Sequence, residues 1–204
     1  MVFSVPRDLL RGMFPLCLCA SVVGFLAAYQ MPQTTDKLHK VVLEPGDFYF
    51  GSGHTRISTL LGSCISITLW HPRKHIGGMC HYMLTERNTH NTRPANTPLD
   101  GRYAHEAFEL FLQHVEAAGT RPSEYQAKLF GGGNMFDGGV SGKLDIGPRN
   151  IEYGRKLLAS KNIALMAEHV GGSGRRKLHF ELWSGHVLLA FPEGSGAQTR
   201  TMYG

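Results

Sequence analysis

Two short segments of the sequence carry residue types that could perform nucleophilic chemistry. In the first, residues 61–64 (LGSC), Cys64 follows two small residues directly before an alternating run. Free backbone N–H groups can converge at such a turn, where they lower the pKa of a thiol and stabilise a developing oxyanion. The second, residues 77–84 (GGMCHYML), contains His81. A cysteine and a histidine brought together form a thiolate–imidazolium pair, the arrangement needed for nucleophilic acyl transfer.

The elements that must position these two residues are two neighbouring strands. In residues 65–70 (ISITLW) apolar and other side chains alternate, which predicts a strand with two different faces. Residues 71–74 (HPRK) predict a turn, and residues 76–84 predict a second strand. The two strands together predict a hairpin, which would bring His81 within reach of the Cys64 end.

The same residues leave two other interpretations open. A free cysteine is among the most buried residue types and usually packs as a small hydrophobe, and a histidine on a strand can simply be hydrogen-bonded in the core. A metal site is the second alternative, because Cys64, Cys80, His81 and His75 are chemically able to bind zinc. No Cys-x-x-Cys occurs in the chain, which weakens this alternative.

Glycine is concentrated near these segments. The chain has 25 glycines in 204 residues, without a Gly-X-Y period. Residues 130–136 (FGGGNMF) look superficially like a phosphate cradle, but they lack the Gly-Lys-Ser/Thr ending of a P-loop and the Gly-x-Gly-x-x-Gly of a dinucleotide site. We therefore expect residues 131–133 to allow close backbone packing around a site.

The remaining pattern predicts a mixed α/β fold, with β-sheet layers built from hairpins and flanked by helices, rather than a doubly wound parallel sheet. Apolar residues at three- and four-residue spacings predict a helix over 103–118, ended by Gly119. A second helix is expected over 151–161. Further strands are expected over residues 41–43, 57–60, 127–130, 163–167, 178–182 and 187–191.

The amino-terminal region differs from the rest. Residues 13–29 form an apolar stretch preceded by two arginines, which is short for a spanning helix of ~20 residues but suits a secretory signal or an anchor. A true start at Met31 would give the same appearance. We treat residues 1–40 as an amino-terminal extension and residues 41–204 as the domain.

Charge and cysteine content exclude several classes of protein. The formal net charge is +5, and the only dense basic run, residues 175–177 (RRK), lacks interleaved aromatic residues. Nucleic-acid binding is therefore not expected, and the run predicts a charged hairpin tip or a loop that contacts an acidic partner. Four cysteines are too few for a disulfide scaffold, so packing must stabilise the fold.

Four segments together resemble the CheD family of chemoreceptor glutamine deamidases. They are residues 59–64 (TLLGSC), 77–84 (GGMCHYML), 130–136 (FGGGNMF) and 146–150 (IGPRN). The resemblance covers roughly residues 41–191. It implies a cysteine-dependent amidohydrolase that converts glutamine side chains of methyl-accepting chemotaxis receptors to glutamate, with release of ammonia. It also implies a fold similar to that of bacterial toxin deamidase domains.

The resemblance implies Cys64 as the nucleophile, His81 as the general base and Thr59 as the third catalytic residue, with Ser58 as the alternative. No metal or organic cofactor is implied. Cys80 would serve packing, although oxidation or metal capture there would compromise the base. The implied location is the cytoplasm, with contact to the membrane only through receptors. A CheC-type phosphatase is a possible second partner, and the alternative function is a non-catalytic module that regulates a receptor or such a phosphatase.

Overall fold

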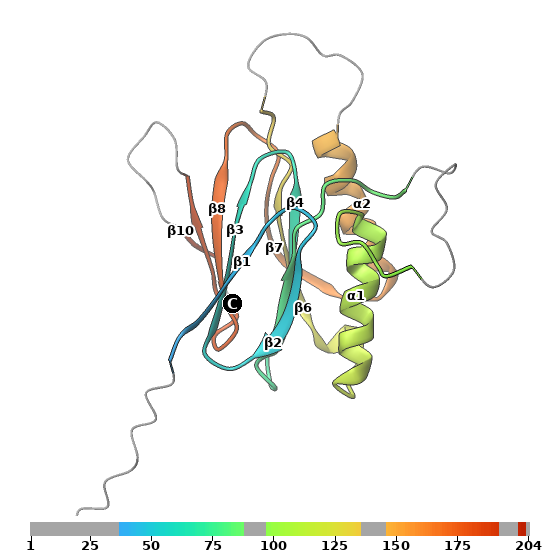
Figure 1. Ribbon diagram of the computed structural model, residues 1–204, viewed down its shortest axis with the longest axis vertical. Coiled ribbons are helices and arrows are strands. Elements are labelled where there is room, and N and C mark those ends of the chain that lie inside the picture. Colours follow the sequence, from blue (N-terminus) through green and yellow to red (C-terminus); the bar gives the residue numbers. More distant parts are fainter. Residues whose placement is uncertain (1–36, 88–96, 136–145, 192–199, 203–204) are drawn as a thin grey trace, which may run out of the picture. The chain divides into compact units, whose positions relative to one another are not determined.

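Two five-stranded β-sheets lie face to face. Two α-helices cover one of these sheets, on the face that points away from the other sheet (Figure 1). The computed structural model describes residues 37–87, 97–135, 146–191 and 200–202. The apolar stretch 13–29 and the expected start at Met31 lie outside these residues. None of the helices in the described ranges is long and apolar enough to cross a membrane.

The sheet without helices, here called the outer sheet, has the strand order β1-β3-β8-β9-β10. Its strands are β1 (His39–Leu43), β3 (Thr55–Leu61), β8 (Arg176–Glu181), β9 (Val187–Ala190) and β10 (Arg200–Met202). β1 and β3 run parallel, whereas the other neighbours are antiparallel.

The second sheet, here called the central sheet, has the order β2-β5-β4-β6-β7. Its strands are β2 (Phe48–Ser52), β5 (Ile76–Cys80), β4 (Ile65–His71), β6 (Gln126–Gly131) and β7 (Ala164–Val170). The predicted hairpin of β4 and β5 is confirmed, with antiparallel pairing. Because this sheet is covered on both faces, β4 is buried from Ile65 to Leu69.

Two apolar cores follow from this layering. Between the sheets, the inward side chains of β3, β8 and β9 meet those of the central sheet, with Ile57, Phe180 and Met79 fully buried. On the other side of the central sheet, Ile67 and Phe111 belong to the core shared with the helices. The predicted mixed α/β fold is confirmed, and the helices flank the central sheet.

The two helices pack on the central sheet. α1 (Ala104–Ala117) matches its prediction closely and ends before Gly119, whose φ of 62° suits a residue without a side chain. A short 3-10 helix, η1 (Pro122–Glu124), leads into β6. α2 (Ile146–Ser160) begins five residues earlier than predicted. Pro148 is compatible with that start, because a proline in the first turn loses no intrahelical hydrogen bond.

The link from β1 to β2 carries the chain from the outer sheet to the central sheet. Gly46 lies in this link with a φ of 97°, a backbone conformation that favours glycine. Its N–H donates to the carbonyl of His81 at 2.7 Å, and the N–H of His81 donates to the carbonyl of Asp47 at 3.0 Å. The link from β1 to β2 therefore holds the backbone of His81 through two hydrogen bonds.

Candidate active site

His81 lies one residue beyond β5, with its side chain in the space between the two sheets. Its neighbours Cys80 and Tyr82 belong to the core on the helix side, and side chains alternate between the faces of an extended chain. His81 is 2% exposed. Its side chain is thus directed toward the outer sheet, near the ends of β1 and β3 and the link from β1 to β2.

Thr59 of β3 is the hydrogen-bond partner of the His81 ring. Thr59 Oγ1 lies 2.8 Å from His81 Nδ1, and it donates to the carbonyl oxygen of Leu43 at 2.8 Å. All three groups are buried or nearly so, with Thr59 3% and Leu43 4% exposed. The parallel pairing of β1 with β3, which sets Leu43 opposite Thr59, creates this arrangement.

These contacts define which nitrogen of His81 carries the proton. A hydroxyl has a single proton, and a carbonyl can only accept, so the Thr59 proton lies between Thr59 and Leu43. Nδ1–H of His81 must then donate to Thr59 Oγ1. Nε2 is left with a free lone pair, and it has no hydrogen-bond partner among the described residues. This is the tautomer that a general base acting through Nε2 requires.

Ser58, the alternative third residue, lies on the opposite face of β3. Its hydroxyl is 2.7 Å from Nδ1 of His179, its cross-strand neighbour on β8. Successive residues of a strand point to opposite faces, so Ser58 cannot share the inward direction of Thr59. The structure therefore brings Thr59, and not Ser58, to His81.

Cys64 ends a short loop between β3 and β4, and its side chain packs against the core between the sheets. It is a free cysteine of intermediate exposure. β4 and β5 pair with Thr68 opposite Met79, and the bridge between Ile65 and Tyr82 continues this register. Ser66 therefore lies opposite His81. Cys64, two residues before Ser66, is then a diagonal neighbour of His81 on the same face, at a separation of ~7–8 Å between Cα atoms. Among the described residues, no hydrogen bond joins the Cys64 thiol to Nε2 of His81.

Burial favours the neutral forms of both groups. It raises the pKa of the Cys64 thiol, and the N–H of Cys64 itself lowers this pKa only in part. Burial also lowers the pKa of His81, against the opposing effects of the Leu43 carbonyl and of Asp47. These directions favour a neutral thiol beside a neutral imidazole in the resting protein, rather than the thiolate–imidazolium pair expected from the sequence.

The glycine segment 131–133 passes directly behind the 62–64 loop. Gly132 N–H donates to the carbonyl of Cys64, and Gly133 N–H donates to that of Gly62, both at 2.9 Å. A Cβ on Gly131, whose φ is 116°, would lie 2.1 Å from the Cys64 carbonyl oxygen. The prediction that these glycines permit close backbone packing is confirmed.

The same hydrogen bonds orient the N–H groups of the loop. In a trans peptide the C=O and N–H point in opposite directions. Because the Gly62 carbonyl is held by Gly133, the N–H of Ser63 points away from the glycine segment. Neither Ser63 N–H nor Cys64 N–H donates to a carbonyl within the described part of the chain. Backbone donors that no carbonyl occupies are suited to holding an oxyanion.

Cys80 occupies a different environment from Cys64. It is 1% exposed, belongs to the core on the helix side, and burial raises the pKa of its thiol to about 12. Such a thiol stays protonated and packs as a small apolar group. No group of three or more metal-ligating side chains occurs among the described residues, including Cys64, Cys80, His81 and His75.

The chain matches the family model for CheD chemotactic sensory transduction over residues 83–190. It is 67% identical over 174 residues to "Probable chemoreceptor glutamine deamidase CheD 3" of Dechloromonas aromatica, covering 85% of this chain and 100% of that protein. It is 44% identical over 152 residues to "Probable chemoreceptor glutamine deamidase CheD" of Pseudomonas savastanoi pv. phaseolicola, covering 74% and 83%. The chain belongs to the CheD family. A Leptospira interrogans protein named "Probable chemoreceptor glutamine deamidase CheD 1" is 38% identical over 164 residues, covering 78% and 96%.

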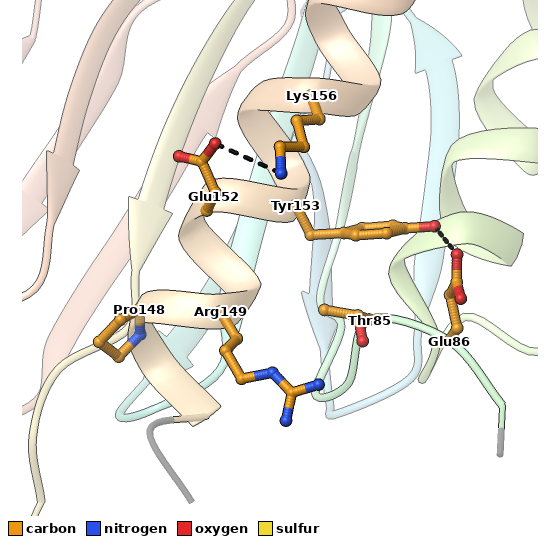
Figure 2. A pocket seen from close by; sticks show the side chains of 7 residues that line it. All are labelled: Thr85, Glu86, Pro148, Arg149, Glu152, Tyr153 and Lys156. Carbon is orange, nitrogen blue, oxygen red and sulfur yellow. Dashed lines mark hydrogen bonds and ion pairs between the residues drawn. The ribbon is translucent and has the colours of Figure 1, made fainter.

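A pocket of about 540 Å³ on this CheD chain lies beside α2 (Figure 2). It is lined by Thr85, Glu86, Pro148, Arg149, Glu152, Tyr153 and Lys156. Tyr153 donates its hydroxyl proton to Glu86, and Glu152 pairs with Lys156 at 3.7 Å. None of the residues predicted for catalysis lines it, so the pocket is separate from the Cys64 and His81 region.

α2, which lines this pocket, is hydrogen-bonded to the two residues that follow His81. Asn150 is 1% exposed, and its Nδ2 donates to the carbonyl of Met83 at 2.6 Å. The Tyr82 hydroxyl donates in turn to the Asn150 carbonyl at 2.8 Å. The fourth motif of the CheD resemblance, residues 146–150, therefore holds the segment that follows His81 through two hydrogen bonds of Asn150.

The prediction for the basic run 175–177 is wrong at Arg176. The run 175–177 predicted a charged tip or loop, yet Arg176 is 1% exposed and begins β8. The signal that would have revealed this is the alternation of Arg176 with Leu178 and Phe180, which share its inward face and are fully buried. Sequence reasoning also missed the Leu43 carbonyl, because its approach to Thr59 depends on pairing between distant strands.

Proposed function

We propose that this chain is a cysteine-dependent amidohydrolase that deamidates glutamine side chains of methyl-accepting chemotaxis receptors to glutamate. The observation that carries the proposal is the hydrogen bond from His81 Nδ1 to Thr59, which leaves Nε2 unpartnered on the face that also bears Cys64. The names of the relatives supply the substrate class, and the thiol, imidazole and hydroxyl supply the chemistry.

Acylation begins when the glutamine side chain enters beside Cys64. Nε2 of His81 takes the thiol proton, and the sulfur attacks the amide carbon, forming a C–S bond and an oxyanion. The N–H groups of Ser63 and Cys64 hold this oxyanion, and a donor of this kind typically contributes ~3–4 kcal/mol to catalysis. The C–N bond then breaks as the His81 imidazolium gives its proton to the leaving nitrogen, and ammonia departs.

Deacylation uses the same base. His81 Nε2 takes a proton from water, the hydroxide attacks the thioester carbon, and the C–S bond breaks. The proton held on His81 returns to sulfur, so glutamate is released and Cys64 regains its neutral thiol. Thr59 and the Leu43 carbonyl hold the ring through Nδ1 during both half-reactions. Every step uses side chains and backbone of the chain together with water.

The proposed setting is the cytoplasm, where the enzyme would reach the membrane only through its receptor substrates. A CheC-type phosphatase is proposed as a possible second partner. The alternative function is a non-catalytic module that regulates a receptor or such a phosphatase. The intermediate exposure of Cys64 and the free Nε2 of His81 favour hydrolysis, because a pure docking surface has no need for either.

Mass spectrometry of a receptor cytoplasmic fragment incubated with the protein tests this proposal. We expect conversion of specific glutamines to glutamate with release of ammonia, and loss of both in Cys64→Ala. Cys80→Ala is the matched control, because Cys80 faces the helices and should leave turnover within twofold of the wild type. Full activity of Cys64→Ala would overturn the mechanism. Chemotactic function that survives Cys64→Ser would favour the binding module instead.

A further inference from the structure

Arg176 is a buried cation beside the 62–64 loop, and the mechanism above gives it no role. It is 1% exposed and lies opposite Leu61 in the antiparallel pairing of β3 with β8. Leu61 is the residue that leads into the loop, and both side chains face the core between the sheets. Arg176 therefore lies in the same layer as Cys64.

The guanidinium of Arg176 holds backbone carbonyls instead of a carboxylate. Nη1 donates to the carbonyl of Gly131 at 2.7 Å and to that of His169 at 3.0 Å, and Nη2 donates to the carbonyl of Gly171. No acidic side chain pairs with it among the described residues. Burial lowers the pKa of Arg176, yet a guanidinium stays charged in proteins. A buried charge without a counter-ion is destabilising, so these three carbonyl dipoles must compensate for it.

One of these carbonyls belongs to the peptide group that holds Cys64. The C=O of Gly131 and the N–H of Gly132 are the two ends of a single trans peptide unit. Arg176 holds the first end, and the second end donates to the Cys64 carbonyl at 2.9 Å. Gly171 N–H donates to the same Gly131 carbonyl at 2.9 Å, which adds a second donor at this end.

We infer that Arg176 is a positioning residue for the reaction, since it holds the Gly131–Gly132 peptide group that fixes the Cys64 carbonyl. This inference rests on the proposed function, in which Cys64 is the nucleophile. Through Gly133 and the Gly62 carbonyl, the same segment turns the N–H of Ser63 away from itself, and in the proposed mechanism this N–H holds the oxyanion. Arg176 acts on turnover through the loop and does not touch the substrate.

The shape of arginine explains why this residue type stands here. Its planar guanidinium presents five N–H donors in a fixed fork, so one side chain reaches several carbonyls at once. A lysine ammonium keeps the charge but offers a single donor centre at the end of a flexible chain. Methionine keeps an unbranched apolar stem and donates no hydrogen bond. The series Arg, Lys, Met at position 176 thus removes the geometry first and then the charge.

The test compares Arg176→Lys and Arg176→Met in the full chain with Lys177→Met as the matched control. Lys177 is the exposed neighbour on the opposite face of β8. The readouts are kcat and KM for deamidation of a receptor cytoplasmic fragment, the thermal midpoint, and the rate of iodoacetamide alkylation assigned to Cys64 by peptide mass spectrometry. Cys64→Ala is measured beside them, so that failure of the nucleophile assignment is visible separately.

We expect Arg176→Met to lower kcat at least tenfold with KM within twofold, to change the alkylation rate of Cys64, and to keep a cooperative thermal transition. Arg176→Lys should be intermediate, and Lys177→Met should stay within twofold of the wild type. The inference is overturned if a folded Arg176→Met keeps kcat within twofold while Cys64→Ala is inactive. If Arg176→Met does not fold, Arg176→Lys decides by the same criterion. Activity in Cys64→Ala would instead reject the proposed function.

Discussion

Thr59 Oγ1 lies 2.8 Å from His81 Nδ1, and its own proton is directed to the Leu43 carbonyl, also at 2.8 Å. The threonine joins the outer sheet to the central sheet at His81, the residue proposed as the base. It accepts from the imidazole and so selects the tautomer with a free Nε2. A residue able only to pack would fill the same space without this selection.

Replacing Thr59 by Val tests that selection. The near-isosteric change removes the hydroxyl, leaves Nδ1 and the Leu43 carbonyl without their partner, and allows the wrong tautomer. We expect kcat to fall roughly tenfold to a hundredfold, part of the ~10²–10⁴-fold that a positioned general base contributes. Thr59→Ser should restore most of the loss, because it returns the hydroxyl. Ser58→Ala, on the opposite face, should leave kcat within twofold. Equal losses in Ser58→Ala and Thr59→Val would contradict the assignment.

The pKa directions at Cys64 and His81 predict how the thiol reacts with pH. Burial raises the pKa of Cys64 and lowers that of His81, so the resting thiol is protonated. The alkylation rate of Cys64 should therefore still be rising above pH ~8.5, the ordinary thiol value. The acid limb of kcat/KM should lie below pH ~6.5, because His81 must be neutral to act as a base. A flat, fast alkylation rate from pH 5 to 8 would instead indicate a preformed ion pair.

The hairpin of β4 and β5 and the mixed α/β fold are predictable from the sequence, because both depend on local periodicity and turn residues. The roles of Cys64 and His81 come from the family resemblance and stay predictions. The choice between Ser58 and Thr59 depends on which of the two side chains points inward, and the outward apolar residue Leu60, which is 46% exposed, obscures the alternation along β3. The Leu43 carbonyl could not be predicted at all, because it depends on parallel pairing across the sheet.

Gly131 provides a test of close backbone approach. A Cβ at this position would lie 2.1 Å from the Cys64 carbonyl oxygen, and the φ of 116° is unfavourable for any side chain. Gly131→Ala should lower the free energy of unfolding by more than ~3 kcal/mol, beyond the ordinary range for single substitutions, and should reduce kcat in whatever fraction folds. Gly119→Ala is the matched control, because its φ is 62° but no atom lies within 4 Å of the added Cβ. That variant should lose ~1–2 kcal/mol, the strain of a left-handed residue, and keep its kcat. Equal losses of stability in both variants would show that the steric contact with Cys64 is unimportant.

The burial of Lys128 predicts that the free energy of unfolding rises with pH above about pH 8. This β6 residue is 4% exposed, its Nζ donates to the Gly185 carbonyl at 2.7 Å, and burial lowers its pKa to about 8. The folded state therefore loses this proton near pH 8, whereas the unfolded chain keeps it until pH ~10.4. Between these values the unfolded state binds more protons, so the free energy of unfolding should increase with pH, by at most roughly 3 kcal/mol from this group.

Urea unfolding of the wild type and of Lys128→Met at pH 7.5, 8.5 and 9.5 isolates that contribution. Other titrations, including that of Cys80, are common to both proteins and cancel in the difference. The free energy of unfolding of the wild type should rise relative to Lys128→Met at each step. A difference that stays constant across this range would mean that Lys128 keeps an ordinary pKa in the folded protein. The core between the sheets, which also receives Cys64, would then be better hydrated than its burial indicates.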